Sequence, residues 1–199
     1  MARGMKITRI TIWQYGWEVR DLGLDHNGFN QVDAPGARKE GRAHVLTIET
    51  DAGITGEFAG GDASSYSQVG AMARFLVGKD PLQRELLYND MKRAMRKLDR
   101  MGLGPIDIAL WDIAGKAYEA PLYELLGGWK KTLPCYASTL HGDHVRAGGL
   151  SSPEAFADFA VQCKEIGYPA FKIHGWGHDH RSGQDVCSRG VRTAHEQAQ

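Results

Sequence analysis

The sequence lacks several features that would each indicate a special class of protein. It has no surplus of either charge, because 24 Lys and Arg residues balance 24 Asp and Glu residues. This balance disfavours the clustered basic surface of nucleic-acid-binding proteins. No apolar run approaches the roughly 20 residues of a membrane span, and the N-terminus has no apolar segment typical of a signal peptide. We therefore expect a cytoplasmic protein that binds neither nucleic acid nor membrane.

Cysteine is also scarce, and its placement excludes two kinds of cross-link. The three cysteines, Cys135, Cys163 and Cys187, are odd in number and far apart in the sequence. Such spacing argues against a disulfide framework and for a reducing compartment. Since there is no Cys-x-x-Cys pair, the sequence does not predict a zinc site.

The first 60 residues contain strand patterns. Residues 6–15, 44–50 and 54–59 are rich in β-branched side chains or alternate in polarity, and Asp51-Ala52-Gly53 forms a turn signal between the last two. The intervening segment Trp17–Gly41 is rich in Gly, Asp and Asn and shows no apolar period. It is predicted to be a long loop, a feature that is often functional inside a compact domain. The three strands are expected to form an antiparallel meander.

Helix patterns follow between residues 64 and 128. Apolar residues recur at helical spacing over 64–77, after Asp80-Pro81, and from about Pro105 onward, and Pro121 begins a further short turn. Three strands followed by helices are typical of an α+β domain. Near residue 130 the pattern changes to a strand at 133–139, a helix from Ser152 and a strand at 170–174. Strand, helix and strand in this order form a βαβ unit with a parallel sheet.

One long segment carries a family resemblance. Residues 104–128 read G-P-I-D-I-A-L-W-D-I-A-G-K-A-Y-E-A-P-L-Y-E-L-L-G-G, which closely resembles the end of the N-terminal capping domain in the mandelate racemase/muconate lactonizing enzyme family of the enolase superfamily. The T-D-A-G-I-T-G-E hairpin at 50–57 and the strand after Lys131 occur in the family's order. The resemblance implies an α+β capping domain, a three-stranded antiparallel meander followed by helices, at residues 5–130. It also implies the first βαβ unit of an incomplete (β/α) barrel at residues 131–177.

The resemblance implies a class of chemistry as well. Members of the family abstract the proton α to a carboxylate, as acid-sugar dehydratases (lyases) or as racemases and epimerases (isomerases). The family's Lys-x-Lys pair at the end of the second barrel strand corresponds here to Lys172-Ile173-His174, so Lys172 and His174 are the predicted catalytic pair. Side chains two apart on a strand point the same way, and imidazole, with an ordinary pKa near ~6.5, can serve as a base. The alternative is a solvated lysine beside a hydrogen-bonded histidine at a strand end.

The family's capping-domain loops imply the substrate-binding residues. By position these loops correspond to Trp17–Gly41 and to the segment around Gly60-Gly61-Asp62. The candidates in the first loop could bind a small carboxylic acid or the hydroxyls of an acid sugar: Arg20, His26, Asn27 and Arg38. An ordinary solvated loop is the alternative for each of them. Asp107 and Asp112 are predicted to make polar contacts without a catalytic role.

The family's Mg²⁺ ligands are implied to be absent from this chain. They are three carboxylates on the third, fourth and fifth barrel strands, whereas residues 133–199 number 67 against the roughly 200 or more of a barrel. Residues 178–199 contain two clear aliphatics, Val186 and Val191, and are expected to be an aberrant or disordered tail. A frameshift or premature stop, a deliberate fragment and a natural short product are open explanations of this pattern.

Two functions therefore remain open at this stage. The chain is expected to be a fragment of an acid-sugar dehydratase or racemase-like enzyme that is inactive alone. The alternative is a non-catalytic capping module that keeps the contacts of a homo-oligomer. Metal-dependent turnover would separate the two.

Overall fold

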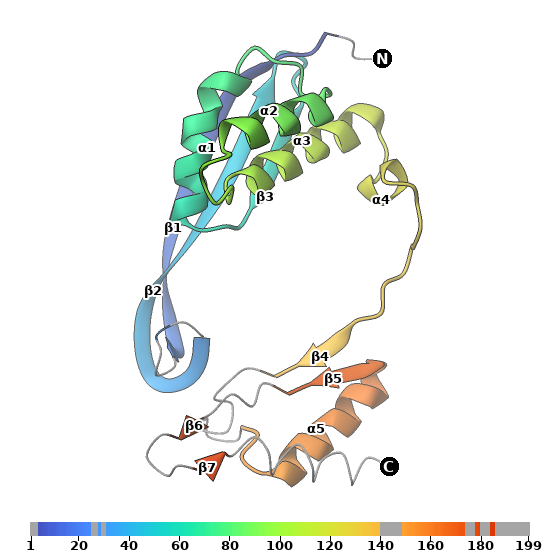
Figure 1. The fold of residues 1–199 in the computed structure, drawn as a ribbon. Coiled ribbons are helices and arrows are strands. Elements are labelled where there is room, and N and C mark those ends of the chain that lie inside the picture. The colour runs from blue at the N-terminus through green and yellow to red at the C-terminus, as the bar shows by residue number, and fades with distance from the viewer. Residues whose placement is uncertain are drawn as a thin grey trace. The chain divides into compact units, whose positions relative to one another are not determined.

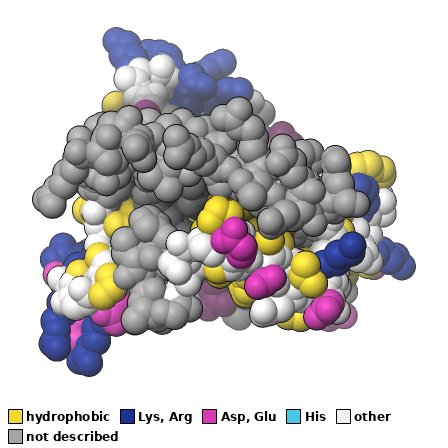
Figure 2. Space-filling model, turned by 90° about the horizontal axis from the view of Figure 1, so that it is seen from below, with side chains coloured by type: hydrophobic (Ala, Val, Ile, Leu, Met, Phe, Trp, Pro, Cys, Tyr) yellow, Lys and Arg dark blue, Asp and Glu magenta, His cyan; other side chains and the backbone are white. Residues whose placement is uncertain are grey.

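The computed structural model describes residues 4–24, 28, 31–139, 149–173, 178–179 and 184–185. The chain divides into two compact units, one made of residues 1–17 and 42–131 and the other of residues 18–41 and 132–199. No helix among the described residues is both long enough and apolar enough to cross a bilayer. On the face drawn in Figure 2, basic, acidic and hydrophobic side chains all occur, as the balanced composition leads one to expect.

A three-stranded antiparallel sheet opens the chain, as the sequence predicted. The strands β1 (Ile7–Leu24), β2 (Gln31–Thr50) and β3 (Thr55–Ala59) lie in the order β1-β2-β3 (Figure 1). The register of β2 and β3 runs from Glu49 opposite Thr55 to Val45 opposite Ala59. At the predicted turn Gly53 has φ +75°, a conformation that glycine adopts without steric cost, and its N–H donates to the Thr50 carbonyl at 3.2 Å.

The prediction of a loop over Trp17–Gly41 is wrong, because β1 continues to Leu24 and β2 begins at Gln31. Among the described residues of this segment only Asp33 is buried. A strand pair that buries no apolar face has no reason to alternate in hydrophobicity, so the usual sequence signal of a strand is missing. The backbone pairing remains, and the Gly36 N–H donates to the Asp21 carboxylate at 2.8 Å across the hairpin.

Four helices follow, with starts close to those predicted. They are α1 (Ala63–Leu76), α2 (Arg84–Ala94), α3 (Leu103–Tyr118) and α4 (Leu122–Leu125). α2 begins three residues later than Pro81. The Asp80 carboxylate accepts a hydrogen bond from the Leu82 N–H at 2.9 Å, and the Asp80 carbonyl accepts one from the Gln83 N–H, so a turn precedes the helix.

The core of the first unit lies between the sheet and the helices, which cover one face of it in Figure 1. Its fully buried large side chains come from the sheet and from α1, α2 and α3: Ile7, Leu46, Ile48, Val69, Leu76, Leu87, Met91, Ile106, Leu110 and Ile113. Sheet and helix approach each other closely at Gly56 of β3, where a Cβ atom, if one were present, would lie 2.1 Å from the Ala109 carbonyl oxygen of α3. Glycine is required there because any side chain would overlap the helix backbone.

The second unit contains the predicted βαβ arrangement. The strands β4 (Tyr136–Ser138) and β5 (Ala170–Lys172) pair in parallel, and α5 (Pro153–Ile166) connects them. The Ser152 hydroxyl caps α5 by accepting from the Ala155 N–H at 3.2 Å, and Gly167 ends it at φ +111°. Two short strands, β6 (His178–Asp179) and β7 (Gln184–Asp185), pair antiparallel. The rest of 178–199 lies outside the described residues.

Candidate functional site

The carboxyl ends of β4 and β5 bring a lysine and a serine side by side. Lys172 is the last residue of β5 and pairs in register with Ser138, the last residue of β4. Parallel strands end at the same edge of a sheet, and in (β/α) barrels that edge holds the chemistry. The structure therefore places Lys172 at the edge where the sequence predicted a catalytic residue.

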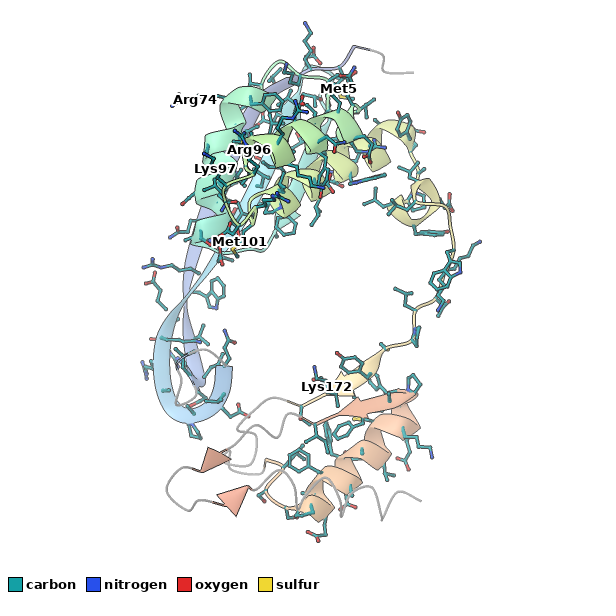
Figure 3. The ribbon with its side chains drawn as sticks, in the orientation of Figure 1. Met5, Arg74, Arg96, Lys97, Met101 and Lys172 are labelled. Carbon is teal, nitrogen blue, oxygen red and sulfur yellow. The ribbon has the colours of Figure 1, made fainter. Side chains whose placement is uncertain are left out.

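The two faces of the β4–β5 sheet differ. Phe171 packs edge-on against Phe159 of α5, with ring centroids 5.9 Å apart. Alternation along the strand puts Lys172 on the opposite face, where it is exposed, and Figure 3 shows its side chain on the side of the strands away from α5. Its ammonium nitrogen lies 5.5 Å from the centre of the Tyr136 ring. The lysine thus stands on the sheet face that does not carry the helix.

Three predicted site residues, His174, His26 and Asn27, lie outside the described residues. The sequence predicted a strand over 170–174, whereas β5 ends at Lys172. The proximity of Lys172 and His174 therefore stays a prediction from their spacing in the sequence.

Arg20 and Arg38 both lie on the β1–β2 hairpin and bind the same carboxylate. The Arg20 Nε–Glu18 Oε1 distance is 2.5 Å, and the Arg38 Nη1–Glu18 Oε2 distance is 3.5 Å. All three side chains are at least 45% exposed, so each ion pair contributes about 0–1 kcal/mol and is easily exchanged. Two guanidinium groups on one carboxylate leave one positive charge that can attract an anion.

Glu18 is a site residue that the sequence analysis missed. It lies two residues before Arg20, so the two side chains share a strand face, but this relation appears only if the segment is read as a strand. Because residues 17–41 were predicted to be a loop, the two-residue repeat of a strand was not applied to them. Glu18 was therefore not grouped with Arg20.

The second predicted loop is organised around Asp62, the N-cap of α1. Its carboxylate accepts hydrogen bonds from the Ser65 N–H at 2.9 Å and from the Ser64 hydroxyl at 2.7 Å. These bonds, led by that from the Ser65 backbone, lower the pKa of Asp62 to about 2. Gly60 and Gly61 both have positive φ, and the Gly60 N–H donates to the His44 carbonyl at 3.0 Å. The loop is thereby tied to β2 at one end and to α1 at the other.

The low pKa of Asp62 gives a testable pH dependence. Because the folded-state pKa lies below the ordinary value of 3.8, the capping interaction is fully present above that value and is lost as the pH falls through about 2. Asp62→Ala should lower the Tm at neutral pH, and the difference from the wild type should shrink as the pH falls from about 3.8 to about 2. Thermal unfolding followed by circular dichroism measures this. Asp62→Asn keeps an acceptor at the N-cap and should stay close to the wild-type Tm at neutral pH; an equal loss for both variants would contradict the capping role.

Asp112 of α3 holds the helix to β3, in agreement with the polar contacts predicted for this residue. The Asp112 carboxylate accepts from the Glu57 N–H at 2.8 Å and pairs with Lys116 at 2.8 Å. Lys116 also donates to the Thr55 carbonyl at 2.7 Å. Burial alone would lower the pKa of Lys116, but the negative charges of Asp112 and Glu57 have the larger combined effect, and the pKa of Lys116 is raised.

Asp107 is the other acidic residue of α3 that the sequence analysis named. Burial raises the pKa of its carboxyl group.

The described residues do not supply a magnesium site. No three His, Cys, Asp or Glu side chains gather in a metal-binding geometry within the part of the chain that the structure describes. The described residues therefore offer cations and hydroxyl groups to a ligand, and no carboxylate cluster that could hold a metal ion.

The fold defines a class of protein. An antiparallel meander with helices, followed by a parallel βαβ unit, is a capping domain that leads into the start of a (β/α) barrel. Residues 31–127 match the N-terminal domain of mandelate racemase/muconate lactonizing enzymes. The chain thus contains the N-terminal capping domain of this enolase-superfamily family.

Several relatives are acid-sugar enzymes. The chain is 39% identical over 129 residues to D-galactarolactone cycloisomerase of Agrobacterium fabrum, a match that covers 60% of this chain and 34% of the relative. It is 33% identical over 138 residues to D-galactonate dehydratase of Xanthomonas oryzae pv. oryzae, with 65% and 34% covered. A crystal structure of D-glucarate dehydratase from Agrobacterium tumefaciens complexed with magnesium superposes with a TM-score of 0.72 at 27% identity, covering 96% of this chain and 51% of that one. The chain thus spans about a third of the curated relatives' length and about half of the solved structure's.

Proposed function

We propose that this chain provides the capping domain and the first barrel βαβ unit of an enzyme that abstracts the proton α to the carboxylate of an acid sugar. The observation that carries the proposal is Lys172 at the carboxyl end of β5, on the sheet face opposite α5. The acid-sugar relatives support this substrate class, because they include a D-galactonate dehydratase and a D-galactarolactone cycloisomerase. Dehydration (lyase) or racemisation (isomerase) would follow the same proton abstraction.

Lys172 and His174 are the proposed catalytic pair. The two residues are separated by one residue in the sequence; if the extended backbone of β5 continues past Lys172, their side chains would project from the same face. One would remove the α-proton, and the other would stay near the carboxylate of the substrate as a second cation or hydrogen-bond donor. This division of roles suits a lysine and a histidine, since imidazole can lose its proton near neutral pH.

Arg20, Arg38, His26 and Asn27 are the proposed substrate-binding residues. Guanidinium groups bind carboxylates with two parallel hydrogen bonds, and the exposed Glu18 contact already shows that both arginines can reach one carboxylate. Histidine and asparagine can donate hydrogen bonds to sugar hydroxyls.

The proposed domain limits are 5–130 for the capping domain, 131–177 for the start of the barrel and 178–199 for a further segment. The family's Mg²⁺ would stabilise the negative charge that develops on the substrate carboxylate. Since the described residues do not form its site, we expect acid-sugar binding without turnover by this chain alone.

Binding of D-galactonate tests the proposal. We expect ligand-observed NMR to detect binding, and the double variant Arg20→Ala/Arg38→Ala and the single variant Lys172→Ala should each weaken it about tenfold or more. The reason is that a hydrogen bond to a charged group contributes about 1.5–3 kcal/mol. In the same samples, with Mg²⁺ in deuterium oxide, the NMR signal of the D-galactonate α-proton should persist, because we expect this chain alone not to exchange that proton with solvent.

Arg9→Ala provides the matched control. Arg9 is 69% exposed and pairs with Glu49 at 2.8 Å on the same sheet, so its removal takes away one exposed arginine outside the proposed site and should leave binding unchanged. Equal weakening by all variants would mean that the binding is due to non-specific electrostatic attraction.

The second candidate function is a capping module that binds a second copy of the chain. A folded chain that binds no acid sugar would favour this candidate. Exposed aromatic side chains at Trp13, Tyr15 and Trp17 of β1 are the observation that favours that candidate.

A further inference from the structure

We infer that Tyr136 is a positioning residue that holds the Lys172 ammonium group at the carboxyl edge of β4 and β5. This inference rests on the proposed function of Lys172, but the contact itself can be tested without turnover. The ammonium nitrogen lies 5.5 Å from the centre of the Tyr136 ring, within the distance at which a cation and an aromatic face attract each other.

The strand register explains why these two residues meet. Tyr136 pairs with Ala170 and Ser138 pairs with Lys172. Tyr136 and Lys172 are therefore diagonal neighbours on one face, a spacing that aromatic and long side chains can bridge. The Thr139 N–H donates to the Lys172 carbonyl at 3.1 Å, which fixes the backbone on which the lysine is carried.

The other face of β5 packs against α5. Phe171 lies edge-on against Phe159 of α5, and alternation along the strand puts Lys172 on the opposite face together with Tyr136. Among the described residues no carboxylate forms an ion pair with Lys172, and the Tyr136 ring lies within reach of its charge. A lysine has four side-chain torsions, and a partner for its end restricts the ammonium group to the region above the ring. Such restriction is what a proton-transfer group requires, because a displaced group loses much of its effect.

NMR of the reductively methylated 199-residue chain tests the inference. Isotope-labelled methyl groups on Lys172, assigned from the signal that disappears in Lys172→Arg, should be shifted upfield by the ring current of Tyr136. Tyr136→Leu should return this signal to the position of exposed lysines, whereas Tyr136→Phe keeps a ring and should preserve the shift. Preservation in Tyr136→Phe also separates loss of the ring from loss of the hydroxyl group.

Lys92 and Tyr88 provide an internal control. The Lys92 nitrogen lies 5.8 Å from the Tyr88 ring in the first unit. Tyr88→Leu should shift the Lys92 signal and leave Lys172 unchanged. If the Lys172 signal of the wild type already coincides with exposed lysines, or if Tyr136→Leu leaves it in place in a folded protein, the inference is wrong. An upfield Lys172 signal in a chain that binds no D-galactonate would uphold the positioning contact while the proposed function fails.

Discussion

Replacing Gly56 with alanine is expected to destabilise the first unit by about 3 kcal/mol, the upper range for an overpacked core. A Cβ at this position would lie 2.1 Å from the Ala109 carbonyl oxygen and 2.6 Å from Ile113 Cγ1. Backbone cannot move aside as a flexible side-chain end can, so β3 would have to separate from α3. Urea unfolding followed by far-ultraviolet circular dichroism measures the change.

Gly70→Ala is the control for this prediction. Gly70 lies in the middle of α1 and a Cβ there would meet no atom within 4 Å. Alanine has the higher helix propensity, so this variant should be more stable by about 0.5–1 kcal/mol. If Gly56→Ala unfolds at the same urea concentration as the wild type, the close approach of β3 and α3 is absent from the protein in solution.

Truncation of Leu110 is expected to lower the free energy of unfolding by a similar amount. The cause is the opposite one, because the core loses packing atoms where Gly56→Ala adds one too many. Leu110 is 0% exposed in the centre of α3, and Leu110→Ala removes its packing and leaves a cavity. Substitutions of this kind lower the free energy of unfolding by about 2–5 kcal/mol, depending on how far the neighbouring side chains move into the cavity. The same urea experiment measures it.

Ile108 on the same helix tests whether burial is the cause. Ile108 is 44% exposed, and Ile108→Ala removes the same number of side-chain carbon atoms. It should cost clearly less than Leu110→Ala, because water already contacts its side chain. Similar losses for both would mean that α3 has another orientation in solution, or that Ile108 is covered by a second molecule.

These two predictions concern the segment that carries the family resemblance, and they assign it a structural role. Asp112 and Lys116 tie α3 to the backbone of β3, and Gly115 is in close contact with Leu122, whose Cδ2 would lie 3.2 Å from a Cβ. The segment therefore fixes the sheet, and with it the Gly60–Asp62 loop that follows β3. Its contribution to chemistry is indirect.

Much of the fold could be predicted from local patterns. The start of α5 at Ser152 was readable because its hydroxyl satisfies a helix-terminal N–H that has no other partner. The βαβ unit followed from two short strands flanking a helix. The strands within residues 17–41 could not be predicted, since their stability comes from backbone pairing with little burial of apolar side chains.

The candidate site was predictable only in part, for a related reason. Lys172 was singled out by the family resemblance, and the structure places it at the carboxyl end of β5. Glu18 could not be found, because its interaction with Arg20 and Arg38 depends on a hairpin whose register no hydrophobic pattern encodes. The functional roles of all the candidate site residues stay predictions.

The amino-acid sequence by itself determined the order of the three opening strands and the helices and the family of the capping domain, because these depend on side chains within a few residues of one another. Tertiary structure alone decided that Gly56 must be glycine, that Glu18 joins two arginines and that Tyr136 meets Lys172. Each of these depends on the distance between segments that are remote in sequence, and that distance is set by sheet register and helix packing.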